Sequence, residues 1–199
     1  TIGAGIPTDG CIAANAHALA RYAALSQEAG LVPIVEPEVL MDGDHTIERC
    51  EAVTEATLHR VFGELVRLRV AFAGMLLKPN MVLAGRSCPR QAGIEEVAEA
   101  TVRCLRRTVP GAVPGVVFLS GGQSPEVATA HLNAMNALGA HPWQLSFSYG
   151  RALQDAALAA WRGDAANVAA GQKAFLHRSR CVGAARSGRY SQQMEMAAA

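Results

Sequence analysis

A lysine follows a short apolar run near the middle of the sequence. Lys78 comes directly after the run Met-Leu-Leu at positions 75–77 and directly before Pro79. Burying an ammonium group is costly, so this side chain either reaches the rim of the core or has a lowered pKa. A neutral lysine amine is the nucleophile that forms a Schiff base with a carbonyl. The position therefore predicts either imine chemistry or a rim lysine held in an ion pair.

Two glutamates could manage the protons of such a reaction. Glu36 and Glu38 follow the apolar segment 31–35 and stand at positions i and i+2. On an extended strand, residues at this spacing point to the same face. Dehydration of a carbinolamine needs an acid, and removal of a hydroxyl proton needs a base. The alternative is a pair of solvated loop acids on either side of Pro37.

Two glycine-containing segments could bind a phosphate. Residues 120–124 read Ser-Gly-Gly-Gln-Ser between an apolar run and an expected helix, where open backbone N–H groups and a helix N-terminus favour anions. The segment has no Walker lysine, so a nucleotide-triphosphate cradle is excluded. Residues 148–151 read Ser-Tyr-Gly-Arg and add a guanidinium suited to bidentate phosphate contact. Each segment alone could also be a tight turn, and Arg151 a surface arginine.

Four repeated strand–helix units would position these residues. Apolar runs of strand length alternate with stretches of helical periodicity, after a first helix that ends before Gly30. The sequence predicts strands at 31–35, 74–77, 115–119 and 143–147 and helices at 13–29, 46–69, 94–107, 125–137, 152–161 and about 167–178.

This alternation predicts the α/β class, with a parallel sheet whose strands are buried on both faces. The candidate catalytic and phosphate-binding residues come at the carboxyl ends of the strands, where barrels and doubly wound sheets bind ligands. A doubly wound dinucleotide fold needs a G-x-G-x-x-G turn after its first strand, and the sequence has none. We therefore favour a (β/α)8 barrel, whose usual phosphate site follows strands seven and eight.

Composition narrows the classes of partner. The 199 residues are 50% hydrophobic and carry a net charge of +1, which gives no basic surface for nucleic acid. No apolar stretch reaches the roughly 18 residues of a membrane span, so we expect no membrane partner. The five cysteines and six histidines show no zinc-finger spacing or other ligand pair, so we expect free thiols in a reducing compartment and no metal. Thr1 follows no initiator methionine, which suggests an incomplete chain.

Several motifs together resemble a known family. The strings VPIVEPE, DGDH, LLKPNM, FLSGGQS and SFSYGRALQ occur between about Asn15 and Tyr190 in the order and spacing of class I fructose-bisphosphate aldolases. The resemblance implies a (β/α)8 TIM barrel and a cytoplasmic lyase of glycolysis and gluconeogenesis. Such an enzyme reversibly cleaves fructose 1,6-bisphosphate to dihydroxyacetone phosphate and glyceraldehyde 3-phosphate. It uses a covalent Schiff base, with no metal and no other cofactor.

The resemblance also implies roles for individual residues. Lys78 matches the Schiff-base lysine, Glu36 the catalytic acid and base, and Glu38 a carboxylate that supports the lysine. The residues that match the substrate-phosphate groups are Ser120, Gly121, Gly122, Ser148, Gly150 and Arg151.

Two departures from the family pattern affect the domain assignment. The first four barrel strands have no counterpart here, so residues 1–182 resemble the C-terminal half of the barrel, and 183–199 are expected to be a mobile tail. The family usually ends in a tyrosine that assists proton exchange, whereas this sequence ends in Ala199. Tyr190 matches an internal tyrosine of the family instead.

Two functions follow as hypotheses. The first is an aldolase whose substrate is a phosphorylated ketose. The second is a catalytically incomplete half barrel that acts as a binding or assembly element. Because four strands leave two sheet edges unpaired, we expect a homo-oligomer or association with a missing N-terminal half. A transaldolase-like Schiff-base enzyme is a third alternative, but it leaves both glycine-containing segments unexplained.

Overall fold

Four short strands form one parallel sheet in the computed structural model, which describes residues 1–196. Neighbouring strands pair in chain order, and the register aligns Val35 with Leu77, Leu77 with Val116, and Val116 with Leu145. The strands are β1 (Ile34–Val35), β2 (Leu76–Leu77), β3 (Gly115–Phe118) and β4 (Gln144–Phe147). This sheet confirms the α/β class and fits the last units of a barrel.

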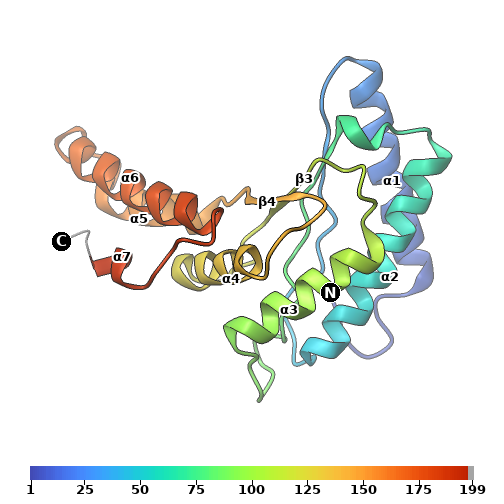
Figure 1. The fold of residues 1–199 in the computed structure, drawn as a ribbon, viewed down its shortest axis with the longest axis horizontal. Coiled ribbons are helices and arrows are strands. Elements are labelled where there is room, and N and C mark those ends of the chain that lie inside the picture. The colour runs from blue at the N-terminus through green and yellow to red at the C-terminus, as the bar shows by residue number, and fades with distance from the viewer. Residues whose placement is uncertain (197–199) are drawn as a thin grey trace.

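The helices follow one another in the order of the strands. Figure 1 shows them from α1 and α2 at the right, through α3 and α4, to α5 and α6 at the left. Their bounds are α1 (Asp9–Glu28), α2 (Ile47–Arg67), α3 (Ile94–Thr108), α4 (Pro125–Ala137), α5 (Arg151–Trp161), α6 (Val168–Ala185) and α7 (Gln193–Met196), with short turns η1 (Phe72–Gly74) and η2 (Ala165–Asn167). No helix among residues 1–196 has the length and apolar character that a membrane crossing requires.

Capping residues set where the helices begin. Ser124 accepts a hydrogen bond from the N–H of Val127, and Pro125 occupies the first position of α4, so this helix has the bounds expected from the sequence. Helix α1 begins four residues before the expected position 13, because Thr8 caps it by accepting from the N–H of Cys11.

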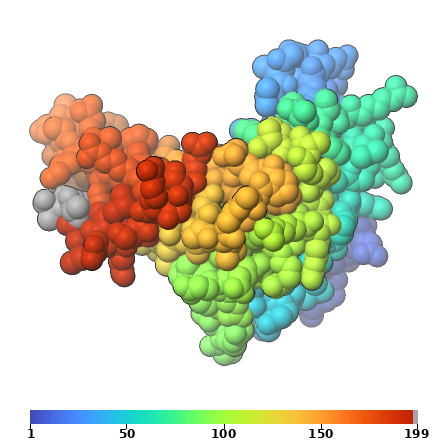
Figure 2. All heavy atoms as spheres, viewed as in Figure 1, coloured from blue at the N-terminus to red at the C-terminus, as the bar shows by residue number. Residues whose placement is uncertain are grey.

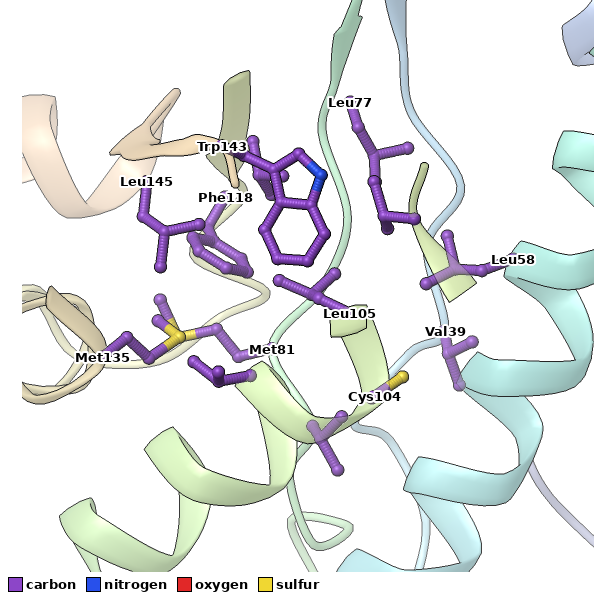
Figure 3. Close-up of a cluster of buried hydrophobic side chains, with 14 of the residues drawn as sticks. Val39, Leu58, Leu77, Met81, Cys104, Leu105, Phe118, Met135, Trp143 and Leu145 are labelled. Carbon is purple, nitrogen blue, oxygen red and sulfur yellow. The ribbon is translucent and has the colours of Figure 1, made fainter. Parts of the chain in front are cut away.

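The core lies between the sheet and the helices that cover it. Leu77, Phe118 and Leu145 from the strands are buried with Leu58 from α2 and Leu105 from α3. Figure 3 shows these side chains converging on one cluster. Burial of these apolar side chains holds α2 and α3 against the sheet.

The other face of the sheet is only partly covered, and one expectation was wrong here. Leu31 and Val32 are 64% and 67% exposed and lie outside β1, although their apolar run predicted a strand buried on both faces. Within β1, Val35 is buried and Ile34 is exposed. Burial on both faces needs a second layer, which β1 lacks at Ile34, whereas β3 is largely buried.

The C-terminal helices form a lobe of their own. Figure 2 shows α5, α6 and α7 gathered at the left end of the molecule. Helix α6 continues to Ala185, so the tail boundary expected at 183 falls inside a helix. Beyond it, the N–H of Tyr190 donates to the side chain of Asn133, and Glu195 pairs with Arg178. Mobility of 183–199 stays a prediction, and residues 197–199 lie outside the described part of the chain.

Two loops beside the carboxyl ends of β1 and β2 interlock through their backbones. The N–H of Gly85 donates to His45 O over 2.7 Å, that of Arg86 to Met41 O over 2.7 Å, and that of Ser87 to Gly43 O over 2.8 Å. A Cβ on Gly85 would overlap the carbonyl of Gly43. The close approach of these loops therefore requires glycine at position 85.

We expect Gly85→Ala to lower the free energy of unfolding by about 1–3 kcal/mol, because the added methyl group meets rigid backbone. The matched control is Gly63→Ala in α2, where a Cβ meets open space. That change should stabilise the protein by about 1 kcal/mol through helix propensity. Urea unfolding measures both variants, and a wild-type midpoint for Gly85→Ala would contradict the close approach.

Candidate active site

Lys78 and Glu36 meet at the carboxyl ends of neighbouring strands. The Nζ of Lys78 lies 3.0 Å from Oε1 of Glu36, with the side chains 19% and 45% exposed. The N–H of Lys78 donates to Val35 O over 2.7 Å, which continues the pairing of β1 and β2 beyond the strands. Lysine and glutamate therefore form the ion pair that one interpretation of the sequence predicted. The same geometry holds a carboxylate beside the amine.

Glu38 shares the face of Glu36 but not its partner. Residues 36 and 38 are exposed while Pro37 and Val39 are buried, so the two carboxylates lie on one face, as their spacing predicted. Glu38 makes no ion pair with Lys78 within residues 1–196. The supporting role that the resemblance implied for Glu38 therefore stays a prediction.

Asn80 connects these two strand ends, and the sequence interpretation did not include it. Its side-chain oxygen accepts from the N–H of Val39 over 2.9 Å, and its Nδ2 donates to Thr54 Oγ1 over 3.2 Å. The residue is buried, so these bonds replace water that it would otherwise bind. Asn80 thus holds the segment with both glutamates against the strand that carries Lys78.

The loop after β3 presents open backbone to the same edge of the sheet. Gly121 and Gly122 have φ angles of +59° and +82°, a conformation that favours glycine. Their N–H groups donate to no acceptor within residues 1–196, while the N–H of Gln123 closes the turn on Ser120 O over 3.0 Å. Two unused donors before the N-terminus of α4 form a place for an anion.

The loop after β4 brings a guanidinium to this glycine turn. The N–H of Ser148 donates to Phe118 O over 2.9 Å, and the buried Tyr149 donates from its hydroxyl to Ala128 O over 2.8 Å. Arg151 then begins α5, and its Nη2 lies 3.7 Å from the point where a Cβ on Gly122 would stand. The structure therefore brings the two predicted phosphate segments together.

A buried histidine, His131, supports the glycine turn through Gln123. The sequence analysis did not identify this residue. Nδ1 of His131 lies 2.6 Å from Oε1 of Gln123, whose Nε2 donates to Ser120 O over 2.9 Å. Because the amide nitrogen of Gln123 faces a carbonyl, its oxygen is the acceptor, and His131 donates from Nδ1. Burial lowers the pKa of His131 to about 4, so the ring is neutral at pH 7. In the sequence, the residue shows only as part of a helix.

A second group of ligand-type atoms lies on the C-terminal lobe. His177, Cys181 and Glu195 place one such atom each within 4.8 Å of the others, a grouping that the sequence spacing had not suggested. Glu195 is already engaged, because Arg178 donates to Oε2 and Tyr190 donates to Oε1. Arg178 supplies the positive charge that a metal would bring, so the group is best described as an ion-pair network.

Lysine and glutamate beside neighbouring strand ends, with a glycine turn and an arginine at the same edge, form a candidate site on a four-stranded parallel sheet. A family model described as "Fructose-bisphosphate aldolase class-I" matches residues 1–199. This chain belongs to the class I fructose-bisphosphate aldolase family.

Individual relatives agree with the family match. A "Probable fructose-bisphosphate aldolase class 1" of Xanthomonas campestris is 57% identical over 95% of this chain and 57% of its own length. A "Fructose-bisphosphate aldolase" of Dictyostelium discoideum is 55% identical over 93% of this chain and 52% of its own. This chain thus spans about half the length of the relatives it matches.

A solved structure extends the likeness to the fold. Fructose-bisphosphate aldolase from Plasmodium falciparum, in complex with TRAP and a small-molecule inhibitor, is similar with a TM-score of 0.92 at 52% identity. The match covers 93% of this chain and 53% of that chain. The expected family and its barrel-derived fold are confirmed.

The buried His131 predicts how stability depends on pH. Its folded pKa of about 4 lies below the ordinary value of 6.5, so between these values the unfolded state binds the extra proton. From pH 7 to pH 4, wild type should lose about 3 kcal/mol more of its unfolding free energy than His131→Asn does. Urea unfolding at each pH gives the difference, from which His45 cancels because both proteins contain it. Parallel losses in the two proteins would refute the neutral buried ring.

Proposed function

We propose that this chain carries the imine-forming and phosphate-binding part of a class I fructose-bisphosphate aldolase. The reaction is the reversible cleavage of fructose 1,6-bisphosphate to dihydroxyacetone phosphate and glyceraldehyde 3-phosphate, in glycolysis and gluconeogenesis. The observation that carries the proposal is the 3.0 Å contact between Lys78 and Glu36, at the sheet edge that also holds the glycine turn and Arg151. No other set of described residues combines an amine, a carboxylate and a phosphate turn.

Lys78 supplies the nucleophile. Its ammonium gives a proton to Glu36, and the neutral amine attacks the ketone carbon of the substrate. Glu36 then returns the proton to the carbinolamine hydroxyl, which leaves as water and forms the iminium. The positively charged nitrogen accepts the electron pair of the breaking carbon–carbon bond. This sink is covalent, so the proposed chemistry uses no metal and no separate cofactor.

Glu36 also serves the cleavage step. As the carbon–carbon bond breaks, a carboxylate removes the proton of the neighbouring hydroxyl, and that carbon leaves as the aldehyde. The remaining enamine takes a proton on carbon, and water releases dihydroxyacetone phosphate from Lys78. Glu38, on the same face, supports the charge of the lysine from a distance.

The phosphate of the dihydroxyacetone half binds at the two loops. The free N–H groups of Gly121 and Gly122 and the N-terminus of α4 favour a dianion, and Arg151 adds a bidentate donor. The residues proposed to bind this phosphate are Ser120, Gly121, Gly122, Ser148, Gly150 and Arg151.

A second candidate function rests on the incompletely covered sheet. The exposed apolar side chains of Leu31, Val32 and Ile34 lie at or beside the edge strand β1. An open parallel edge with apolar neighbours favours pairing with another chain. A half barrel that binds or assembles, either as a homo-oligomer or with a separate N-terminal half, would cover this surface.

The five cysteines bear on the compartment. All of them are free thiols, and four are buried. Free cysteines are typical of reducing compartments, which supports the cytoplasm as the site of the proposed reaction.

Trapping with borohydride tests the proposed imine directly. The sequence has two lysines, Lys78 and Lys173, so the modified position is unambiguous. With saturating dihydroxyacetone phosphate, borohydride should add the reduced triose phosphate to Lys78, as read by peptide mass spectrometry. Lys78→Met should abolish the adduct, and Lys173→Met should leave it unchanged. A folded wild-type sample whose Lys78 stays unmodified would reject the imine and favour the assembly function.

Glu36→Gln tests the acid and base. The amide keeps the shape of the side chain but transfers no proton, so formation of the trapped imine should slow by about 100-fold or more. Glu28→Gln, an exposed change at the end of α1, is the control and should keep the wild-type rate. Timed quenching with borohydride gives both rates. An unchanged rate in Glu36→Gln would assign proton transfer to another group.

A further inference from the structure

The side chain of Arg86 reaches the glycine turn at Gly122, close to Arg151. Its Nη2 lies 2.5 Å from the point where a Cβ on Gly122 would stand, and Nη2 of Arg151 lies 3.7 Å from the same point. Two guanidinium groups from different loops therefore approach one glycine. The missing side chain of Gly122 leaves the space that Arg86 occupies.

The backbone around Arg86 is fixed, so this approach does not depend on a free loop. Its N–H donates to Met41 O over 2.7 Å, and the neighbouring Gly85 and Ser87 bond to the same opposing loop. The side chain thus starts from a defined point and extends toward Gly122. Beside it lies a cavity of about 460 Å³, which Arg86, Gly122 and Ser124 line together.

The two guanidinium groups are poorly neutralised by the protein. The carboxylate that faces Arg86 is Asp42, 3.8 Å away, and the side chains are 57% and 65% exposed, so the pair is weak. Arg151 has no carboxylate partner within residues 1–196. The free N–H groups of the glycine turn and the N-terminus of α4 add further positive potential. An anion with two negative charges would satisfy all of these groups at once.

We propose that Arg86 is a second phosphate-binding arginine, which exchanges Asp42 for the phosphate of the substrate and binds it together with Arg151. This assignment rests on the proposed function, since it concerns the same phosphate. Two guanidinium groups favour the dianion of a phosphate monoester over a singly charged or neutral group. Arg86 would therefore select phosphorylated over unphosphorylated ketoses.

Binding of inorganic phosphate tests the assignment without any imine chemistry. Titration at low ionic strength, followed by phosphorus NMR or calorimetry, should give a dissociation constant about tenfold higher in Arg86→Ala than in wild type. Arg86→Lys keeps the charge but loses the bidentate guanidinium, so its dissociation constant for phosphate should lie between those two values. The matched control is Arg90→Ala, because Arg90 is also exposed on this loop but pairs with Glu96 over 2.8 Å. Its phosphate affinity should equal that of wild type.

A second measurement relates the site to substrate. The concentration that half-saturates borohydride trapping at Lys78 should rise about tenfold in Arg86→Ala for dihydroxyacetone phosphate and stay constant for dihydroxyacetone. Equal phosphate affinity in Arg86→Ala and wild type, or no phosphate binding by wild type, would overturn the assignment. If Arg86→Ala loses phosphate affinity but wild type shows no trapping at Lys78, the assignment of Arg86 stands and the proposed imine is rejected.

Discussion

Parallel hydrogen bonding between strands in chain order is the constraint on which the candidate site depends. The ladder continues past the strand ends, where the N–H of Lys78 donates to Val35 O and that of Ser148 to Phe118 O. Each bond carries the register one step into the loops. Residues more than one hundred positions apart, from Glu36 to Ser148, therefore emerge at a single edge. The strands can be short because their buried side chains also pack against helices, which helps to fix the register of the sheet.

Local patterns were enough to predict the residues at this edge but not how they are held. Lys78 and the segment 120–124 stood out because each follows an apolar run, and the helix expected at 125–137 has the bounds of α4. Asn80 and His131 gave no such signal, since a buried asparagine and a helical histidine resemble many others in a sequence. Their hydrogen bonds join elements far apart in the chain, and only tertiary structure brings those partners together.

The error at β1 has the same origin. An apolar run is consistent with burial on one face or on both, and periodicity does not say how many layers surround a strand. Leu31 and Val32 are exposed although their composition is that of a core strand. This chain spans about half the length of its aldolase relatives, which fits an edge strand that is only partly covered. The apolar runs thus predicted the strands of the sheet. How far each strand is buried depends on which other elements pack against it.

The candidate site combines residues that directly follow strands with residues on loops. Lys78 and Glu36 come directly after the paired strands β2 and β1, so the pairing of the strands brings both side chains to one edge of the sheet. The residues proposed to bind phosphate lie on loops, and hydrogen bonds support these loops. His131 contacts Gln123, and Gln123 donates to Ser120 O in the glycine turn. Arg151 lies close to Gly122 of the same turn. Burial is the main cause of the lowered pKa of His131, and the neutral ring adds no charge beside Gln123. The support that His131 gives to the glycine turn through Gln123 therefore does not depend on a charge.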